Sequence, residues 1–244
     1  MSVSVCMATY NGAAYLAEQL ESILSQLGPD DEVVVVDDGS RDDTLALLQS
    51  WSDSRLHVHR NERNLRHVRT FERAMRLARG QVIFLADQDD VWLPGRVSRM
   101  LQALQVSGAA VVAGNFSHID PQGQSMQFPA HRLRAADSRR GMANIAGIFA
   151  GRRSYFGCAM ALRRDFLDLA LPIPAYVESH DLWIAQLANA AGVIVHLDED
   201  TLARRIHAHN VTRSNRPMRR KLHSRWLFAR ALLEVRRRLH DARQ

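Results

Sequence analysis

Three carboxylates stand close together in the chain, at Asp87, Asp89 and Asp90, directly after the apolar run 82–86. Carboxylates this close repel one another unless water or a cation screens them. Mg²⁺ and Mn²⁺ prefer carboxylate oxygens as ligands and also accept phosphate oxygens. The cluster could therefore hold a divalent cation, although a solvated acidic turn in which Asp90 caps a following helix is the simpler alternative.

Two further polar groups follow predicted buried strands. Residues 9–12 (Thr-Tyr-Asn-Gly) come after the apolar run 2–8, and residues 37–40 (Asp-Asp-Gly-Ser) come after 32–36. The carboxyl ends of parallel strands lie at one edge of a sheet, and ligands bind there. We therefore expect these two groups and the three carboxylates to form one site.

The elements that must position this site alternate between strands and helices. Such alternation predicts one α/β domain with a parallel sheet and helices on both of its faces. The expected strands are 2–8, 32–36, 56–60, 82–86, 109–114, 157–162, 193–197 and 201–206; the expected helices follow residue 12 and cover 44–51, 66–79, a stretch entered at Pro94, 139–149, 182–191 and the chain from 217 onward.

The positive charge of the chain is concentrated in its last part. Residues 213–244 hold eleven Lys or Arg against two acids, which leaves 21 basic and 24 acidic residues for 1–212. A nucleic-acid-binding function would therefore rest on the tail alone. The tail is predicted to be a basic helix that packs on the domain, on a second subunit in a homodimer, or on an anionic membrane surface. Its expected apolar stripe consists of Leu222, Trp226, Ala229, Leu232 and Leu233.

Composition also bounds the class of protein. No apolar run is long enough to cross a bilayer and the chain starts without a basic leader, so we expect a cytoplasmic protein, with the basic tail as a possible contact to the cytoplasmic face of the inner membrane. Cys6 and Cys158 both lie in apolar segments, which favours buried free thiols over a disulfide.

Five motifs, in this order, resemble those of family 2 glycosyltransferases. They are residues 8–12, 37–40, 87–92 (Asp-Gln-Asp-Asp-Val-Trp), 180–181 (His-Asp) and 205–210 (Arg-Ile-His-Ala-His-Asn). The resemblance implies inverting enzymes of GT-A fold, with a Rossmann-like, mostly parallel central sheet flanked by helices and a nucleoside-diphosphate sugar as donor. It implies a domain over 1–212, with a nucleotide-binding half at about 1–114 and an acceptor half at about 115–212, followed by the basic extension 213–244.

The resemblance also assigns roles on the donor side. Asp38 would accept a hydrogen bond from the imide N–H of uracil or thymine, which suits an acceptor-only carboxylate. Asp89 would bind Mg²⁺ or Mn²⁺ directly, with His207 completing the metal shell, and Asp87 would contact ribose or the metal through water. The remaining expected contacts to the nucleotide-sugar are Thr9, Tyr10, Asn11 and Gln88.

On the acceptor side, Asp181 is the candidate general base, because inversion needs one group to take the proton of the acceptor hydroxyl. Its position at a helix N-terminus lowers a carboxylate pKa, and burial could offset that effect. His180, Trp92 and Trp183 are possible contacts to the acceptor or the sugar, although core packing is an equal expectation for the two tryptophans.

The sequence thus predicts a metal-dependent inverting glycosyltransferase of bacterial surface-polysaccharide or lipopolysaccharide assembly, acting on a glycan or lipid-linked acceptor. The form of residues 87–92 and the His180-Asp181 pair look most like rhamnosyltransferases, which use dTDP-rhamnose. A UDP-hexose donor is the alternative. A sugar nucleotidyltransferase is more remote, because residues 9–12 do not form a glycine-rich phosphate loop bearing Arg or Lys.

Overall fold

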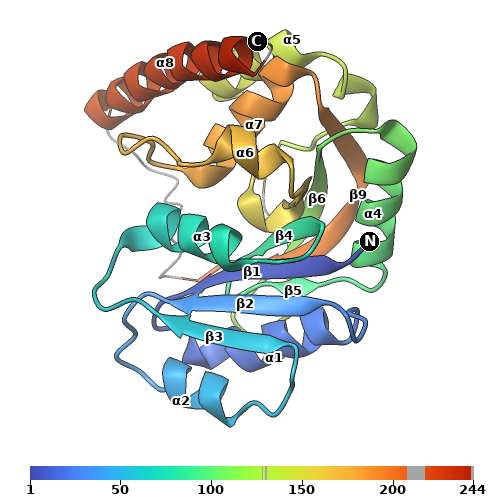
Figure 1. The fold of residues 1–244 in the computed structure, drawn as a ribbon, viewed down its shortest axis with the longest axis vertical. Helices are drawn as coiled ribbons and strands as arrows, with labels where there is room; N and C mark the ends of the chain where they lie inside the picture. Colours follow the sequence, from blue (N-terminus) through green and yellow to red (C-terminus); the bar gives the residue numbers. More distant parts are fainter. Residues whose placement is uncertain (128, 130, 208–217, 243–244) are drawn as a thin grey trace.

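The computed structural model describes residues 1–127, 129, 131–207 and 218–242, and it has the predicted α/β architecture (Figure 1). One sheet has the strand order β3-β2-β1-β4-β8-β6-β9-β5, with β7 paired to β6. The strands are β1 (Val3–Thr9), β2 (Glu32–Asp37), β3 (Leu56–Arg60), β4 (Val82–Ala86), β5 (Val91–Trp92), β6 (Val111–Ile119), β7 (Ser125–Met126), β8 (Met160–Arg163) and β9 (Ile194–Arg205). The helices are α1 (Ala13–Leu24), α2 (Thr44–Ser50), α3 (Arg66–Leu77), α4 (Arg96–Ser107), η1 (Ala135–Asp137), α5 (Gly141–Phe149), η2 (Gly157–Ala159), α6 (Phe166–Ala170), α7 (His180–Ala191) and α8 (Met218–Asp241).

The half of the sheet that comes first in the chain is parallel. β1 pairs with β2 and β4, β2 pairs with β3, and all three pairings are parallel. Thr9 lies opposite Asp37, which in turn lies opposite Arg60, so these strands end in register. The polar residues that follow β1, β2 and β4 therefore meet at one edge of the sheet, as the sequence predicts.

The other half of the sheet is mixed, so the predicted sheet also contains antiparallel strands. β8 runs antiparallel to both of its neighbours, β4 and β6, whereas β9 is parallel to β6 and antiparallel to β5. The two strands expected at 193–197 and 201–206 form the single strand β9, whose pairing with β6 shifts register around Asn115. At this irregularity the side-chain amide of Asn115 donates hydrogen bonds to the backbone carbonyls of Leu197 (2.9 Å) and Asp198 (3.1 Å). The predicted boundary near residue 114 falls inside β6, so both halves share one sheet.

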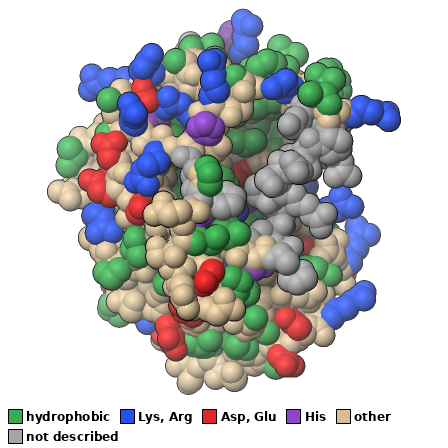
Figure 2. Space-filling view, turned by 180° about the vertical axis from the view of Figure 1, so that it is seen from behind, with side chains coloured by type: hydrophobic (Ala, Val, Ile, Leu, Met, Phe, Trp, Pro, Cys, Tyr) green, Lys and Arg blue, Asp and Glu red, His purple; other side chains and the backbone are tan. Residues whose placement is uncertain are grey.

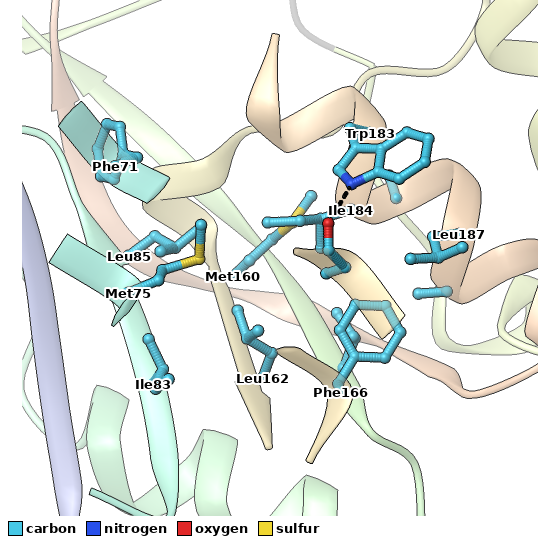
Figure 3. Close-up of a cluster of buried hydrophobic side chains, with 14 of the residues drawn as sticks. Phe71, Met75, Ile83, Leu85, Met160, Leu162, Phe166, Trp183, Ile184 and Leu187 are labelled. Carbon is cyan, nitrogen blue, oxygen red and sulfur yellow. Dashed lines mark hydrogen bonds between the residues drawn. The ribbon is translucent and has the colours of Figure 1, made fainter. Parts of the chain in front are cut away.

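Two apolar clusters cover the two faces of the sheet, because side chains along a strand alternate between faces. One cluster packs α1 and α4 against the sheet through side chains that include Leu16, Leu20 and Met100. The other lies under α3, α6 and α7 (Figure 3). In the second cluster, the labelled side chains are Phe71, Met75, Ile83, Leu85, Met160, Leu162, Phe166, Trp183, Ile184 and Leu187. Cys6 and Cys158 are buried free thiols, as expected.

The basic helix predicted at the end of the chain is α8, but its packing face differs from the expected stripe. Leu222, Trp226 and Leu233 are 57%, 58% and 67% exposed. Ala231 and Val235, which the stripe did not include, are buried against the domain. Apolar residues occupy both sides of α8, and the sequence pattern alone does not tell which side packs. Among the described residues, no helix is long and apolar enough to cross a membrane.

Candidate active site

The three loops at the carboxyl edge of the sheet are tied together by side-chain hydrogen bonds. The Gln88 amide bonds the backbone of Tyr10 on both sides: its Oε1 accepts from Tyr10 N (2.7 Å) and its Nε2 donates to Tyr10 O (3.1 Å). Asn11 N donates to Ser40 Oγ (2.9 Å), and Asn11 Oδ1 accepts from Arg41 N (2.8 Å). The loop after β1 is thereby fixed to the loops after both neighbouring strands. Tyr10 and Gln88, expected to bind nucleotide, thus also hold each other.

Asp37, which the sequence offered only as part of a motif, organises the end of β2. Its buried carboxylate accepts from Gly39 N (3.1 Å), from Ser40 N (3.0 Å) and from the Ser40 hydroxyl. The Thr9 hydroxyl also donates to this carboxylate (3.3 Å), and the Thr9 side chain is buried. The Thr9 hydroxyl is therefore engaged as a donor within the protein, and its contact to the nucleotide stays a prediction.

Asp38 supports the turn that leads into α3. Its Oδ1 accepts from Asn61 Nδ2 (2.7 Å) and Leu65 N (2.7 Å), and its Oδ2 accepts from Arg66 N (2.9 Å). Arg66 has a left-handed backbone, with φ of 65°. A carboxylate offers about four acceptor positions, so the two oxygens can take one further donor. That remaining position is where an imide N–H of a base could bind.

The acidic cluster after β4 is crowded and partly withdrawn from water. Burial and the Asp89 charge raise the pKa of Asp87 to about 7. Asp90 is buried, and burial together with the charges of Asp87 and Asp89 raises its pKa well above the ordinary value. Asp90 does not cap α4: that helix begins after Gly95 without a side-chain cap, and Asp90 Oδ1 instead accepts from Arg205 N (3.1 Å). The simple helix-cap alternative is therefore excluded for Asp90.

Arg205 and His207 bring the end of β9 to this cluster. The buried Arg205 guanidinium donates from Nε to Asp89 O (3.0 Å) and from Nη2 to Glu18 Oε2 (2.5 Å). His207 Nε2 lies 2.7 Å from Asp89 Oδ2. The structure thus brings together Asp89 and His207, the two residues predicted to share a metal, from positions 118 residues apart.

The donor atoms at this edge suit a hard divalent cation. Asp90 Oδ2 is buried without a hydrogen-bond partner in the described part of the chain, and burial together with the neighbouring carboxylates raises the pKa of Asp87 and Asp90. Asp87, Asp90 and Cys158 also place potential ligand atoms within 4.8 Å of one another. Burial raises the pKa of the Cys158 thiol, so this neutral sulfur is a poor ligand for Mg²⁺ or Mn²⁺. The carboxylates and His207 are the fitting ligands.

Asp181 lies in the first turn of α7, on the same side of the sheet edge as the cluster. Its Oδ1 accepts from Leu182 N (2.8 Å) and from the hydroxyl of the N-cap residue Ser179. Burial raises its pKa, and the Leu182 N–H opposes the shift only in part. The charge of Asp181 raises the pKa of Asp87 in turn, so the two carboxylates are close enough to interact. Of the two opposing effects on the pKa of Asp181 that the sequence suggested, burial is larger than the effect of the helix N-terminus.

The short helix η2 separates the candidate base from the acidic cluster. The backbone N–H of Gly157 lowers the pKa of Asp181, and the neighbouring Cys158 thiol lies against Asp87 and Asp90. A Cβ on Gly157 would come within 2.7 Å of His180 Nε2 and 3.5 Å of Asp181 Cβ. The absence of a side chain at Gly157 therefore allows α7 to approach the sheet edge. Sequence reasoning missed this residue, since a lone glycine in an apolar run gives no such signal.

His180 and the two tryptophans are not displayed on the site surface. The buried His180 ring stacks on Phe71 at 4.1 Å, and burial with the nearby His67 lowers its pKa to about 3. Trp92 is buried against Arg96, and Trp183 is buried with its indole N–H donated to Ala170 O (2.9 Å, the dashed line in Figure 3). The expected sugar contacts of Trp92 and Trp183 are therefore corrected: both are core residues.

The family model for glycosyl transferase family 2 matches residues 4–169. The chain belongs to this family. The succinoglycan biosynthesis protein ExoO of Rhizobium meliloti (strain 1021) is 34% identical over 126 residues, which cover 52% of this chain and 36% of that protein. The UDP-Glc:alpha-D-GlcNAc-diphosphoundecaprenol beta-1,3-glucosyltransferase WfgD of Escherichia coli is 27% identical over 118 residues, covering 48% and 47%. The chain thus spans less than half of the length of either relative.

A solved structure supports the fold over nearly the whole chain. The crystal structure of S. aureus TarS 1-349 in complex with UDP-GlcNAc superposes with a TM-score of 0.70, covering 98% of this chain and 72% of that one at 19% identity. At this identity the likeness concerns the fold alone. The predicted family and the predicted GT-A fold are both confirmed.

Replacing Gly157 by Ala tests whether η2 sets the position of the base. The new Cβ would displace His180 by several tenths of an ångström or more, because 2.7 Å is well inside van der Waals contact, and the neighbouring Asp181 would shift with it. Misplacement on this scale is expected to lower kcat about 10- to 100-fold and leave the thermal unfolding temperature within a few degrees. Gly151→Ala, at a position with no atom within 4 Å, is a control for activity at another loop glycine, although its φ of 70° adds some strain. Equal activity of Gly157→Ala and wild type would contradict the assignment.

Proposed function

We propose that this chain transfers a sugar from a pyrimidine nucleoside-diphosphate donor to a hydroxyl of a glycan or lipid-linked acceptor, with inversion at the anomeric carbon. The observation that carries the proposal is the position of η2 between the two groups: a Cβ on Gly157 would come within 3.5 Å of Asp181 Cβ, and the next residue, Cys158, has its sulfur within 4.8 Å of potential ligand atoms of Asp87 and Asp90. It supports a candidate base on one side of η2 and carboxylates suited to a metal diphosphate on the other. Family membership supports the reaction class.

In the proposed reaction Asp181 takes the proton of the acceptor hydroxyl as its oxygen bonds to the anomeric carbon. The bond from that carbon to the diphosphate oxygen breaks, and the leaving nucleoside diphosphate takes the electron pair. Asp38 would hold the base, and Asp89, His207 and Asp87 would hold Mg²⁺ or Mn²⁺. When bound, such a cation neutralises charge on the departing diphosphate. The hydrogen bonds among the loops hold these side chains in place before the nucleotide-sugar binds.

Two donors are candidates for this site. The resemblance of residues 87–92 and of the pair His180-Asp181 to rhamnosyltransferases favours dTDP-rhamnose. The names of the E. coli relative and of the TarS complex contain UDP-glucose and UDP-GlcNAc, which favours a UDP-sugar. A panel of dTDP-rhamnose, UDP-glucose, UDP-galactose, UDP-GlcNAc and GDP-mannose, scored for hydrolysis with Mn²⁺ and with chelator, separates these candidates. Turnover of GDP-mannose alone, or of no donor, would overturn the proposal.

Asp89→Ala tests the metal assignment. Loss of a carboxylate that holds the cation is expected to lower donor turnover at least about 100-fold, since metal charge stabilisation contributes several kcal/mol. Metal-dependent donor binding, read by calorimetry with and without Mn²⁺, should be lost together with turnover. Asp30→Ala, an exposed acid at the opposite edge of the sheet, should behave as wild type. Near-normal turnover of Asp89→Ala with retained metal dependence would place the cation elsewhere.

Asp181→Asn tests the base. General-base catalysis contributes about 10²- to 10⁴-fold, so transfer should fall by that factor while donor binding is unchanged. Asp168→Asn is a matched control, because Asp168 is an exposed acid in the first turn of α6. Comparable transfer by Asp181→Asn and wild type would show that the base lies elsewhere.

The wild-type pH profile gives a second readout of Asp181. The base acts in its ionised form, so kcat/KM should fall as the pH drops through its pKa. An ordinary aspartate has a pKa of about 4. Because burial raises the pKa of Asp181, the acidic limb of the profile is expected at a higher pH than that. A limb at or below the ordinary value would contradict the assignment.

A further inference from the structure

The outer face of α8 carries an apolar row that nothing in the described part of the chain covers. Leu222, Trp226 and Leu233 are exposed and spaced by four and seven residues, which places them on one side of the helix. The opposite side, with Ala231 and Val235, packs on the domain. A row of large apolar side chains on a helix already anchored from behind marks a surface that meets a partner.

The charges around this row select an anionic partner. Exposed arginines flank it on both sides: Arg219, Arg225, Arg230, Arg236 and Arg237. The two acids of α8 are neutralised within the helix, since Glu234 pairs with Arg237 (2.7 Å) and Arg238 (2.9 Å), and Asp241 pairs with Arg237 (3.0 Å). Lys and Arg side chains are frequent along the upper rim of the space-filling view, the end of the molecule where α8 lies (Figure 2). An apolar row with Trp, bordered by Arg, is the pattern of helices that lie in a membrane interface.

The position of α8 relates this surface to the acceptor side of the site. Ser224 Oγ donates to Glu178 Oε2 (2.9 Å), and the Arg230 guanidinium lies 4.0 Å from the Tyr176 ring. Residues 176–178 lead directly into α7, which begins with His180 and Asp181. The side of α8 that packs on the domain therefore contacts the segment that leads into the helix with the candidate base.

We propose that the outer face of α8 docks the protein on the surface of a bilayer that contains anionic phospholipids. Leu222, Trp226 and Leu233 enter the head-group region, and the flanking arginines pair with lipid phosphates. Binding needs neither donor nor acceptor, so this inference goes beyond the proposed function and does not depend on it.

Vesicle co-sedimentation of the full chain tests the proposal. Wild type should bind vesicles of phosphatidylcholine with about one-third phosphatidylglycerol, bind phosphatidylcholine alone at least about tenfold more weakly, and lose affinity as salt is added. The triple variant L222S/W226S/L233S should lower binding to the anionic vesicles about tenfold or more. The double variant L77S/V106S removes exposed apolar side chains from α3 and α4 and should bind as wild type.

Four results would overturn the proposal. Wild type could fail to bind anionic vesicles, or the triple variant could bind them as tightly as wild type. Sedimentation could instead show a dimer that the triple variant dissociates, without vesicle binding, which would make this face an interface between two copies. Preference for duplex DNA over anionic vesicles, lost in R219Q/R225Q/R236Q, would assign the face to nucleic acid. Should the triple variant not fold, R219Q/R225Q/R236Q decides, since its vesicle binding should be weaker and less dependent on salt.

Discussion

Repulsion among the carboxylates after β4 is the constraint around which the site is built. Asp87, Asp89 and Asp90 lie in one turn, where burial raises the pKa of the first and the last. Arg205 stabilises the backbone of this turn through Asp89 O, and Arg204 lowers the pKa of both raised carboxyl groups in part. Neither arginine cancels the effect. The divalent cation that we propose for this site would offset the repulsion among these carboxylates.

Many polar residues of the strand-end motifs act on the site indirectly, by fixing the loops that carry it. Asp37 and Asp38 each accept from two backbone N–H groups, and Gln88 is bonded to the backbone of Tyr10. Such bonds fix the loops before any ligand arrives, so binding does not have to supply the cost of ordering them. Motif residues of this kind can be indispensable to activity without touching the substrate. A loss of activity on their substitution therefore does not by itself identify a contact.

The local sequence pattern predicted those features of the structure that depend on residues close together in the chain. The strand ends, the acidic turn and the helix over α7 follow from apolar runs and their polar breaks, and Asp89 with His207 followed from the resemblance. Contacts between distant segments were not predictable in this way. Arg205 begins one of the motifs, but nothing in the sequence shows that its guanidinium bonds Asp89 O and Glu18. Trp183 is held in the core by the carbonyl that α6 supplies to its indole. The packing face of α8 was also open, because both of its sides carry apolar residues.

The antiparallel insertion of β8 explains how residues so far apart in the chain reach one edge. In a purely parallel sheet, only the carboxyl ends of the strands lie at that edge. β8 pairs antiparallel with β4, with Ala161 opposite Phe84, so its beginning lies beside the end of β4. η2 precedes β8 directly and is carried to the acidic cluster by this reversal. β6 is antiparallel to β8, and β9 is parallel to β6, so β9 again ends at the same edge as β4 and delivers Arg205. The mixed half of the sheet, which the sequence did not predict, is thus the part that joins the acidic turn to the candidate base.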